Sequence, residues 1–505
     1  MQKNILEYLE YTAARIPEKV AFSTGKESMT FGEVQLGAKA VGGFLLREGF
    51  SGEPVVIFMD KHPRTVTAFY GVIYAGCFYA CIDAKMPRAR IEAIFENLSP
   101  RAIISDKKNL AAAKELGVER VYLYEDIALS EYTDENSLAD VRRRQSSTDP
   151  IYVVFTSGST GVPKGVVACH RSVIDYTETL IEALGFTEDT VFANQTPLYF
   201  DAPLKELMPT LKLGATTYFV PKMLFSFPVK LVEYLDEYKI NTVCWVVSAL
   251  TLISSLGALE KHTPKYLTTV AFGSEVFPRK QYDLWREALP EARFFNLYGP
   301  TEATGMSCYW RAERELAEDE PIPVGAPFDN TDIILLDENN KRAAEGEQGE
   351  ICIRGTCLTM GYYNNPEKTA EVFVQNPLNT AYPELIYRTG DIGRYNEYGE
   401  LVFISRKDSQ IKHMGHRIEL GEIESAANKS AGVRRAAAVY DGEEKRIVLF
   451  YEGDIDEKAL GKLLGEYLPR YMCPQIIEKL SVMPLTDNGK LHRRELLERA
   501  KSLKA

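Results

Sequence analysis

A loop rich in glycine and hydroxyl groups follows one of the apolar stretches of the chain. This loop, TSGSTGVPKG, runs from Thr156 to Gly165 directly after IYVVF and contains three glycines, four hydroxyl side chains and one lysine. Glycine permits backbone conformations that turn several N–H groups toward one point, and the hydroxyls and Lys164 add donors, which together suit phosphate oxygens. The loop is not of the Walker A type, because Pro163 precedes Lys164 and Gly165 follows it. Taken alone, the same residues also fit a mobile surface turn.

Four further stretches carry side chains that suit a nucleotide and a metal ion. In NLYGPTE a strand end is followed by Thr301 and Glu302, a hydroxyl beside a carboxylate, which are oxygen ligands of the kind that Mg²⁺ prefers. In YRTGD the carboxylate of Asp391 stands in a glycine turn, where it is able to accept hydrogen bonds from a ribose diol. Arg406 lies near the start of SRKDSQIKHMGHRIELGEIE, and Lys490 lies on a turn in PLTDNGK.

Length, charge and cysteine usage limit the classes of protein to which the chain can belong. Its 505 residues exceed the ~250–300 that one hydrophobic core holds, so we expect at least two folding units. The net charge of −12 argues against a nucleic-acid partner. The N-terminus has no secretory h-region, and no run reaches the ~20 apolar residues that span a bilayer. Eight scattered cysteines without CxxC pairs predict reduced, buried thiols in a cytoplasmic protein with no membrane partner.

The order of strands and helices indicates how these residues are held. Apolar strands such as EPVVIFM and FYACID alternate with amphipathic helices, which predicts stacked βαβ units and a mostly parallel sheet. After about Pro321 the β-rich segments TDIILLD, GEICIRG and GELVFISRK predict a smaller barrel-like sheet. We therefore expect an α/β chain with a large N-terminal domain of stacked βαβ subdomains and a small β-barrel-like subdomain, residues 1–406. A small, mobile α+β lid, residues 407–505, follows it.

The ordered motifs resemble those of the adenylate-forming superfamily, which includes acyl-CoA synthetases, luciferases and the adenylation domains of nonribosomal peptide synthetases. The resemblance covers nearly the whole chain, through TSGSTGVPKG, YFDAP, NLYGPTE, GEICIRG, YRTGD, the Ser405–Glu424 block and PLTDNGK. Within the superfamily the chain resembles amino-acid-activating members, including stand-alone D-alanine–carrier-protein ligases. Such ligases join a carboxylate to ATP, release pyrophosphate, and then transfer the acyl group to a thiol.

The resemblance implies an AMP-binding core domain with a role for each motif. The β- and γ-phosphates would be bound by Thr156, Ser157, Gly158, Ser159, Thr160, Gly161 and Lys164. The adenine would be enclosed by Asn296, Tyr298 and the backbone of Gly273, Ser274 and Glu275, with Leu297, Gly299 and Pro300 completing the ATP-binding set. Asp391 would bind the ribose with Arg406 beside it, Glu302 would hold Mg²⁺, and Thr301 would contact the α-phosphate.

The resemblance also implies a moving cationic group. Lys490 would bridge the substrate carboxylate and the charge that develops during adenylation, so it joins Thr301 and Glu302 as a catalytic residue. Because it lies in the C-terminal lid, the lid must dock to insert it and then rotate about a hinge at Asp408 to admit the pantetheine thiol. No general base is expected, since the attacking carboxylate is already ionised.

Asp201, in YFDAP, matches the carboxylate with which amino-acid-activating relatives pair the α-ammonium of the substrate, so we expect an amino acid. By the same resemblance the other pocket residues are Ala202, Lys205, Trp245, Val270, Phe272, Leu297, Gly305, Met306 and Lys490. Trp245 and Phe272 are bulky and suggest a small substrate such as alanine. Phe272 stands where the D-alanine ligases carry a smaller residue, so that identity stays open. Lys205 either pairs with Asp201 or meets an acidic side chain of the substrate.

Three interpretations remain after these observations. The first is a monomeric amino acid–carrier-protein ligase that uses ATP and Mg²⁺; because the chain ends soon after PLTDNGK, its carrier is expected to be a separate protein that supplies the phosphopantetheine. The second is an acyl- or aryl-CoA synthetase that uses free coenzyme A. The third is a non-catalytic nucleotide-binding or scaffold protein on the same fold. His413 and His416 form HxxH without a third ligand nearby, so we expect solvent-facing or carrier-contacting side chains there.

Overall fold

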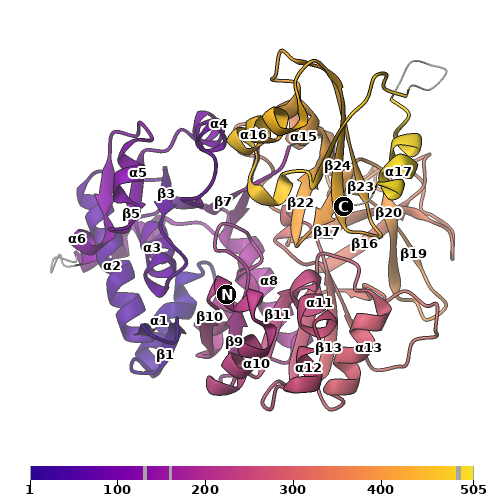
Figure 1. Cartoon of the computed structure of the whole chain (residues 1–505). Helices are drawn as coiled ribbons and strands as arrows, with labels where there is room; N and C mark the ends of the chain where they lie inside the picture. The colour runs from indigo at the N-terminus through magenta and orange to yellow at the C-terminus, as the bar shows by residue number, and fades with distance from the viewer. Residues whose placement is uncertain (1, 129–133, 159–161, 485–490, 504–505) are drawn as a thin grey trace. The chain divides into compact units, whose positions relative to one another are not determined.

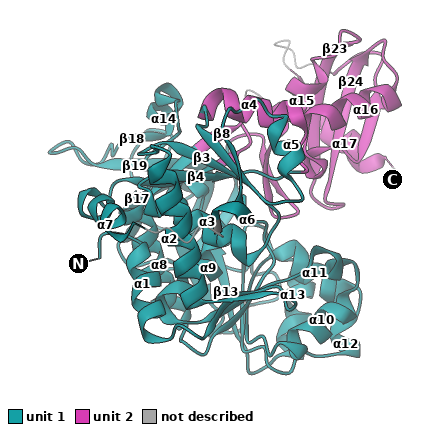
Figure 2. Ribbon diagram, turned by 90° about the vertical axis from the view of Figure 1, so that its left-hand side faces the viewer, with its two compact units in different colours: residues 1–84, 99–154, 166–407 teal, residues 85–98, 155–165, 408–505 magenta. Residues whose placement is uncertain are grey.

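The computed structural model describes residues 2–128, 134–158, 162–484 and 491–503 (Figure 1). By their contacts the residues form two compact units (Figure 2). Unit 1 comprises residues 1–84, 99–154 and 166–407, and unit 2 comprises residues 85–98, 155–165 and 408–505. Since unit 2 also takes in two short segments from the first third of the chain, a domain boundary after Arg406 stays a prediction.

A nine-stranded sheet forms the largest layer of unit 1, in the order β15-β14-β13-β12-β11-β9-β10-β1-β2. Its central strands pair in parallel, and β2, β14 and β15 pair antiparallel at the two edges. The strands are β1 Val20–Ser23, β2 Ser28–Thr30, β9 Val191–Asn194, β10 Thr216–Phe219, β11 Thr242–Val246, β12 Thr269–Gly273, β13 Arg293–Tyr298, β14 Cys308–Arg311 and β15 Ala326–Pro327.

Helices cover both faces of this sheet, as an internal parallel sheet requires. One core cluster joins Cys244 and Ala271 of the sheet to helices α1, α8 and α9, and a second joins Val243 and Val270 to α10, α11 and α13. Their bounds, with the short elements between them, are α1 Leu6–Arg15, α8 His170–Leu184, α9 Leu204–Leu213, η1 Lys222–Ser226, α10 Pro228–Glu237, α11 Val247–Ser255, α12 Ala258–Lys261, α13 Arg279–Ala288 and η2 Thr301–Ala303.

A six-stranded sheet, ordered β6-β5-β3-β4-β7-β8, contains the βαβ units predicted from the first third of the chain. Its strands are β3 Pro54–Phe58, β4 Phe78–Cys81, β5 Ala102–Ser105, β6 Val121–Leu123, β7 Pro150–Thr156 and β8 Lys164–Cys169. The helices between and around them are α2 Phe31–Arg47, α3 Pro63–Tyr74, α4 Arg88–Leu98, α5 Leu110–Lys114, α6 Tyr124–Ala128 and α7 Glu135–Arg144. The phosphate loop connects β7 to β8.

The β-rich segment expected after Pro321 forms a five-stranded antiparallel sheet in unit 1, ordered β16-β17-β19-β18, and β20 pairs with the second half of the long strand β19. Its elements are β16 Thr331–Leu336, β17 Gly349–Gly355, α14 Pro366–Val372, β18 Phe373–Gln375, β19 Leu385–Tyr395 and β20 Leu401–Arg406. The pairing of β19 with β20 puts Asp391 opposite Arg406.

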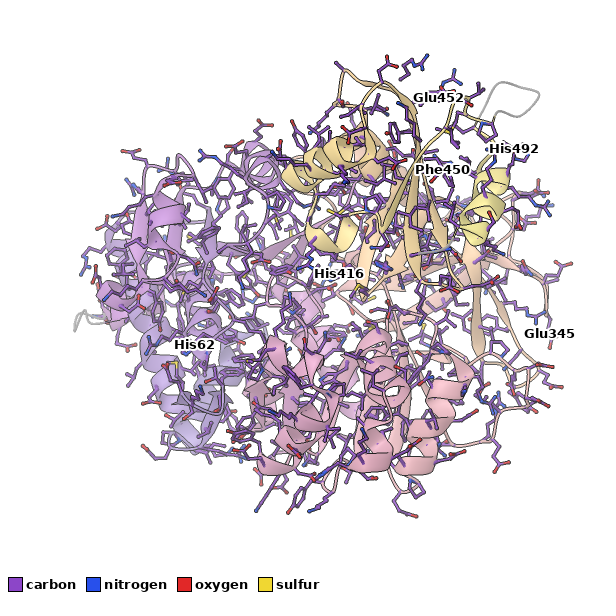
Figure 3. The ribbon with its side chains drawn as sticks, in the orientation of Figure 1. His62, Glu345, His416, Phe450, Glu452 and His492 are labelled. Carbon is purple, nitrogen blue, oxygen red and sulfur yellow. The ribbon has the colours of Figure 1, made fainter. Side chains whose placement is uncertain are left out.

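The C-terminal part of unit 2 is an α+β structure in which β24 pairs antiparallel with β23 and parallel with β25. Phe450 and Glu452 lie on β24, and His492 caps α17 by accepting a hydrogen bond from the Glu495 N–H at 3.1 Å (Figure 3). The elements are β21 Gln410–His413, β22 His416–Glu419, α15 Leu420–Ala427, β23 Val433–Asp441, β24 Arg446–Gly453, α16 Glu457–Tyr467, η3 Arg470–Met472, β25 Ile476–Lys479 and α17 Arg493–Ser502.

Two expectations about the chain as a whole can be compared with these coordinates. All eight cysteines are free, and six of them are buried, while Cys81 and Cys473 are partly exposed. Across the described residues, every helix is too short or too polar to cross a bilayer.

Candidate active site

Several polar contacts of unit 1 surround the carboxylate of Asp391. This side chain is 3% exposed, and the phenol of Tyr298 donates to its Oδ2 at 2.6 Å. The guanidinium of Arg406 contacts its Oδ1 and also donates to the Thr389 carbonyl oxygen at 3.1 Å. A carboxylate has about four lone-pair directions, so further acceptor positions remain for the hydroxyls of a diol. Burial and the charge of Asp391 raise the pKa of Tyr298 well above its usual value, so this phenol stays a donor.

Glu302 is a second buried carboxylate of unit 1, held at the short turn η2. Its side chain is 0% exposed, and its Oε1 accepts a hydrogen bond from the Tyr362 phenol at 2.6 Å. The backbone carbonyl of Glu302 accepts from both the N–H and the hydroxyl of Thr359, at 3.0 and 2.9 Å. Thr304, which follows, has a left-handed φ of 57°, and its hydroxyl donates to the Cys357 carbonyl at 2.7 Å. These bonds hold the turn that presents Glu302.

The oxygen ligands at this turn fit a Mg²⁺ ion that is bound to the phosphates of a nucleotide. Among the described residues, three or more acidic, histidine or cysteine side chains nowhere gather into a cage for a metal ion. Mg²⁺ bound to phosphates does not need such a cage, because it keeps several waters and takes only one or two carboxylates. Glu302, with the Thr301 hydroxyl beside it, provides a ligand set of that size.

Asp201 precedes helix α9, and its carboxylate is partly buried. Burial raises its pKa, and a hydrogen bond from the Thr301 side chain and the charge of Lys205 oppose that rise. Asp201 lines a cavity of about 10 Å³, room for about one water molecule, whose other lining residues are apolar or aromatic. Lys205 is 4% exposed, and it acts on Asp201 through its charge, without a side-chain hydrogen bond or an ion pair between these two described residues. The pairing of Lys205 with Asp201, one of the two predicted arrangements, is therefore not formed within ion-pair distance.

The other predicted pocket residues divide between the two core clusters of the nine-stranded sheet. Leu297 and Met306 belong to the cluster that contains Leu204 and Leu207 of α9. Trp245, Val270 and Phe272 belong to the cluster on the α10–α13 face. The indole N–H of Trp245 donates to the Ala193 carbonyl at 2.6 Å, and the ring of Phe272 packs at 4.9 Å from that of Phe277. Their predicted effect on the length of the pocket stays a prediction. Ala202 is partly buried, and Gly305 has a φ of 92°.

The residues expected around the adenine lie at the carboxyl ends of β12 and β13. A Cβ on Gly273 would approach the Leu297 carbonyl oxygen to 2.2 Å, and one on Gly299 would approach Met306 Cα to 2.5 Å, so both strand ends require glycine. Ser274 has a left-handed φ of 69°. The Glu275 carboxylate accepts from the Ser248 N–H at 2.9 Å, and the Asn296 amide donates to the Pro323 carbonyl at 2.8 Å. Pro300 begins the turn that leads into Thr301.

The described part of the phosphate loop belongs to unit 2 and contacts the C-terminal segment there. The Ser157 hydroxyl donates to the Arg417 carbonyl at 2.9 Å and accepts from the Glu419 N–H at 3.2 Å. Lys164 Nζ lies 3.7 Å from a carboxylate oxygen of Glu419. A Cβ on Gly158 would approach the Val162 carbonyl oxygen to 2.0 Å, which explains glycine at that position. Buried Thr156 Oγ1 lies 3.5 Å from the Lys164 carbonyl.

Some of the predicted residues lie outside the described part of the chain: Ser159, Thr160, Gly161 and Lys490. Asp408 is the first residue of the last segment of unit 2, and its carboxylate accepts from the Gln410 N–H at 3.2 Å.

One of the two histidines of HxxH is placed differently from the prediction. His413 is only 3% exposed, so the expectation of a solvent-facing ring is wrong for it, because it lies on a strand that packs against Tyr440. The ring of His416, labelled in Figure 3, stacks on Tyr471 with a centroid distance of 3.7 Å.

Sequence reasoning missed three polar residues around the segment that carries Asp201: Lys61, Asn194 and Glu206. Lys61 follows β3 and Asn194 ends β9, and the carboxyl ends of parallel strands are where α/β proteins place their functional residues. Glu206 lies in the helix LKELMPTLKL, eight of whose ten residues are buried. A carboxylate in so apolar a helix was the sequence signal that could have identified Glu206, since charged residues are almost never fully buried without a partner.

Comparison with known proteins agrees with this arrangement. The model of the AMP-binding enzyme family matches residues 9–363. The L-proline–[L-prolyl-carrier protein] ligase of Streptomyces coelicolor is 32% identical over 96% of this chain and 94% of its own length. Tyrocidine synthase 1 of Brevibacillus parabrevis is 29% identical over 98% of this chain, but the chain spans only 45% of that synthase.

The fold is that of a solved adenylation protein. Holo-PA1221, a nonribosomal peptide synthetase protein with adenylation and peptidyl-carrier domains, superimposes with a TM-score of 0.86 at 23% identity, over 98% of this chain and 84% of that one. The predicted α/β fold is confirmed, as are the predicted relationship to adenylate-forming proteins and the classification as an enzyme of the ligase class. The chain belongs to the AMP-binding enzyme family.

Proposed function

We propose that this enzyme activates an amino acid with ATP, forming an aminoacyl-adenylate and pyrophosphate, and then passes the aminoacyl group to the thiol of a carrier protein. The observation that carries the amino-acid assignment is the carboxylate of Asp201. It makes no ion pair with another described residue, although burial disfavours its charged form. A buried carboxylate without a counter-ion is costly, and the α-ammonium of an amino acid supplies one. A fatty or aryl acid has no group that could do so.

The first half-reaction brings two anions together. A carboxylate oxygen of the amino acid attacks the α-phosphorus, and the bond from that phosphorus to the leaving pyrophosphate breaks. Mg²⁺, bound with the nucleotide, would offset negative charge on the phosphates. In unit 1 Asp391 would orient the ribose, with Arg406 compensating its charge, and Glu302 would hold the metal ion while Thr301 contacts the α-phosphate. Orientation of this kind accounts for a large part of the rate of such reactions.

The phosphate loop and Lys490 would supply positive charge in the same step. Ser157 and Lys164 are donors of the required type, and we assign them, with the remainder of the loop, to the β- and γ-phosphates. Lys490 would stabilise charge as the carboxylate attacks, acting as a fixed cation rather than as a base. These roles rest on the resemblance of the motifs and on the family match.

An exchange assay tests the first half-reaction. Amino-acid-dependent exchange of labelled pyrophosphate into ATP is measured across the twenty L-amino acids and D-alanine. We expect exchange with one amino acid or a small group of them. If none supports exchange, the third interpretation, a non-catalytic nucleotide-binding protein, is favoured instead.

A second assay tests the acceptor and the hinge. With the accepted amino acid, loading of a phosphopantetheinylated carrier protein is compared with loading of free coenzyme A; faster transfer to coenzyme A would favour the second interpretation. Asp408→Pro should preserve pyrophosphate exchange and reduce thiol loading, since proline restricts the backbone at the proposed hinge. Equal loss of both half-reactions would contradict the hinge.

We further propose that the substrate has an acidic side chain, which would pair with Lys205. By the resemblance this lysine lines the substrate pocket, and it acts on Asp201 through its charge without an ion pair between the two. A buried cation that forms no ion pair with another described residue would be stabilised by an anionic ligand group. Lys205→Met keeps the length of the side chain and removes the charge, so it should lower exchange with L-glutamate selectively. An equal loss for alanine and glutamate would contradict the assignment.

A further inference from the structure

Three polar side chains from separate elements meet inside unit 1, next to the segment that carries Asp201. Lys61 Nζ donates to the backbone carbonyls of Asn194 and Gln195, at 2.9 and 3.1 Å. The Asn194 amide donates to Glu206 Oε2 at 3.2 Å. Asn194 and Glu206 are both 0% exposed. We call Lys61, Asn194 and Glu206 the α9 anchor.

The α9 anchor connects the two ends of a short irregular segment. Asn194 is the last residue of β9, and Glu206 lies in the first turn of α9, so the bond between their side chains bridges residues 195–205. Within that segment the Leu204 N–H donates to the Asp201 carbonyl at 2.9 Å, and the Glu206 N–H donates to the Pro203 carbonyl at 3.1 Å. Asp201 is therefore connected by one helical turn to a residue that the anchor fixes.

Burial of the α9 anchor is energetically unfavourable for its polar and ionisable groups. Glu206 Oε1 and Asn194 Oδ1 are buried and have no hydrogen-bond partner in the described part of the chain. Burial raises the pKa of Glu206 to about 8, against the opposing charges of Lys205 and Lys61, and lowers the pKa of Lys61 to about 7. Well-packed apolar side chains in place of buried ionisable groups are often neutral or stabilising. Stability alone therefore does not account for these residues.

Different contacts hold the opposite end of α9. There the Thr12 hydroxyl donates to the Leu211 carbonyl at 2.6 Å, and Gly214 ends the helix with a φ of 83°. Thr12 is 0% exposed, like Asn194 and Glu206. The Arg15 guanidinium also donates to the Leu213 carbonyl at 2.8 Å, and Lys212 forms an ion pair with Glu178. The end of the helix is therefore held mainly through its backbone carbonyls, whereas at its beginning the Glu206 side chain accepts from the buried amide of Asn194. The α9 anchor lies at the end that leads to Asp201.

We propose that Lys61, Asn194 and Glu206 are positioning residues for amino-acid binding, which hold residues 195–205 so that the Asp201 carboxylate meets the substrate ammonium. The proposal rests on the proposed function. It predicts an effect on the amino acid and little effect on ATP, because the residues assigned to ribose and metal, Asp391 and Glu302, are held by other contacts. A merely structural role would change both substrates together.

The test compares variants at the two ends of α9. Glu206→Ala should raise the KM for the accepted amino acid by about tenfold, as expected for the loss of one buried hydrogen bond, and change the KM for ATP by less than about twofold. Glu206→Gln should recover most of the affinity, since its amide oxygen is able to accept from Asn194. Thr12→Val is the matched control: it removes a buried hydrogen bond from the far end of α9 and should leave both KM values unchanged while lowering the melting temperature.

Each outcome has a definite meaning. An equal rise of both KM values in Glu206→Ala, no rise in either, or the same amino-acid effect in Thr12→Val would overturn the proposal. If Glu206→Ala does not fold, Lys61→Met and Asn194→Ala carry the same expectation. If the unaltered enzyme shows no amino-acid-dependent exchange, the proposed function fails; if it shows exchange and the variants match it, only the anchor fails.

Discussion

Two aspartates of unit 1, Asp391 and Asp201, differ in the partners that surround their carboxylates. Asp391 receives the phenol of Tyr298 at 2.6 Å and the guanidinium of Arg406, so its charge is compensated within the protein. Asp201 receives a hydrogen bond from Thr301, feels the charge of Lys205, and makes no ion pair with another described residue. Burial raises the pKa of Asp201.

This difference indicates which kind of ligand group each carboxylate favours. A compensated carboxylate is a fixed acceptor that suits neutral hydroxyl groups, because a diol brings no charge of its own. An uncompensated one gains most from a cationic ligand, because the ligand removes the penalty of burial. By this argument the surroundings of Asp391 favour the hydroxyls of a ribose, and those of Asp201 favour the α-ammonium of an amino acid.

The largest effect is expected from the uncompensated aspartate. Asp201→Asn keeps the shape of the side chain and removes its charge, so the bound ammonium would be buried without a partner. The kcat/KM for the amino acid should fall by about 10²- to 10³-fold, the cost of breaking a buried charge pair. Pyrophosphate exchange at varied amino-acid concentration measures it. If the KM for ATP rose equally, Asp201 would belong to the nucleotide site and the comparison would fail.

The compensated aspartate should show the opposite selectivity and a smaller effect. Arg406→Ala leaves Asp391 buried with one donor fewer, which should raise the KM for ATP by about tenfold or more and leave that for the amino acid nearly unchanged. Arg406→Lys is the control that restores the charge without the planar guanidinium. Titration with ATP at saturating amino acid gives both values. An unchanged KM for ATP in Arg406→Ala would contradict the assignment of Asp391 to the ribose.

The motifs predicted from the sequence concern strand ends and turns, because glycine, proline and charged residues mark such places directly. The opposition of Asp391 and Arg406 follows from the pairing of β19 with β20, and the glycines at 273 and 299 follow from close backbone approaches. The sequence could not show that Trp245 and Phe272 pack with the α10–α13 face, since side-chain direction depends on strand register. Nor could it show Tyr362 donating to Glu302 or Lys61 donating to the Asn194 carbonyl, because those partners are far apart in the chain.

Glu206 offers a test of the comparison through pH, since it resembles Asp201 in being buried without an ion pair to another described residue. Its pKa in the folded protein is about 8, above the value of 4.5 in an unfolded chain, so the folded state binds the proton more tightly. Its contribution to stability is complete below about pH 4.5 and is lost as the pH rises through about 8. Glu206→Gln resembles the protonated form at every pH.

The free energy of unfolding in urea, measured for both proteins from about pH 5 to 9, should show Glu206→Gln gaining on the unaltered enzyme as the pH rises, by about 5 kcal/mol at most. Lys61, whose pKa burial lowers to about 7, has the opposite dependence: its stabilising contribution is lost as the pH falls through about 7. Because Lys61 is present in both proteins, its effect largely cancels in the difference. A difference that does not depend on pH would show that Glu206 is ionised throughout.

The smallest effect is expected in unit 2, where a carboxylate occupies donors that are assigned to phosphate. Glu419 lies 3.7 Å from Lys164 Nζ, and its N–H donates to the Ser157 hydroxyl. ATP phosphates would have to replace the carboxylate on Lys164, so Glu419→Gln should lower the KM for ATP by about two- to fivefold, the value of a weak ion pair. The KM for the amino acid serves as the internal control and should not change. A raised KM for ATP would show instead that Glu419 holds Lys164 in its binding position, as Arg406 holds Asp391.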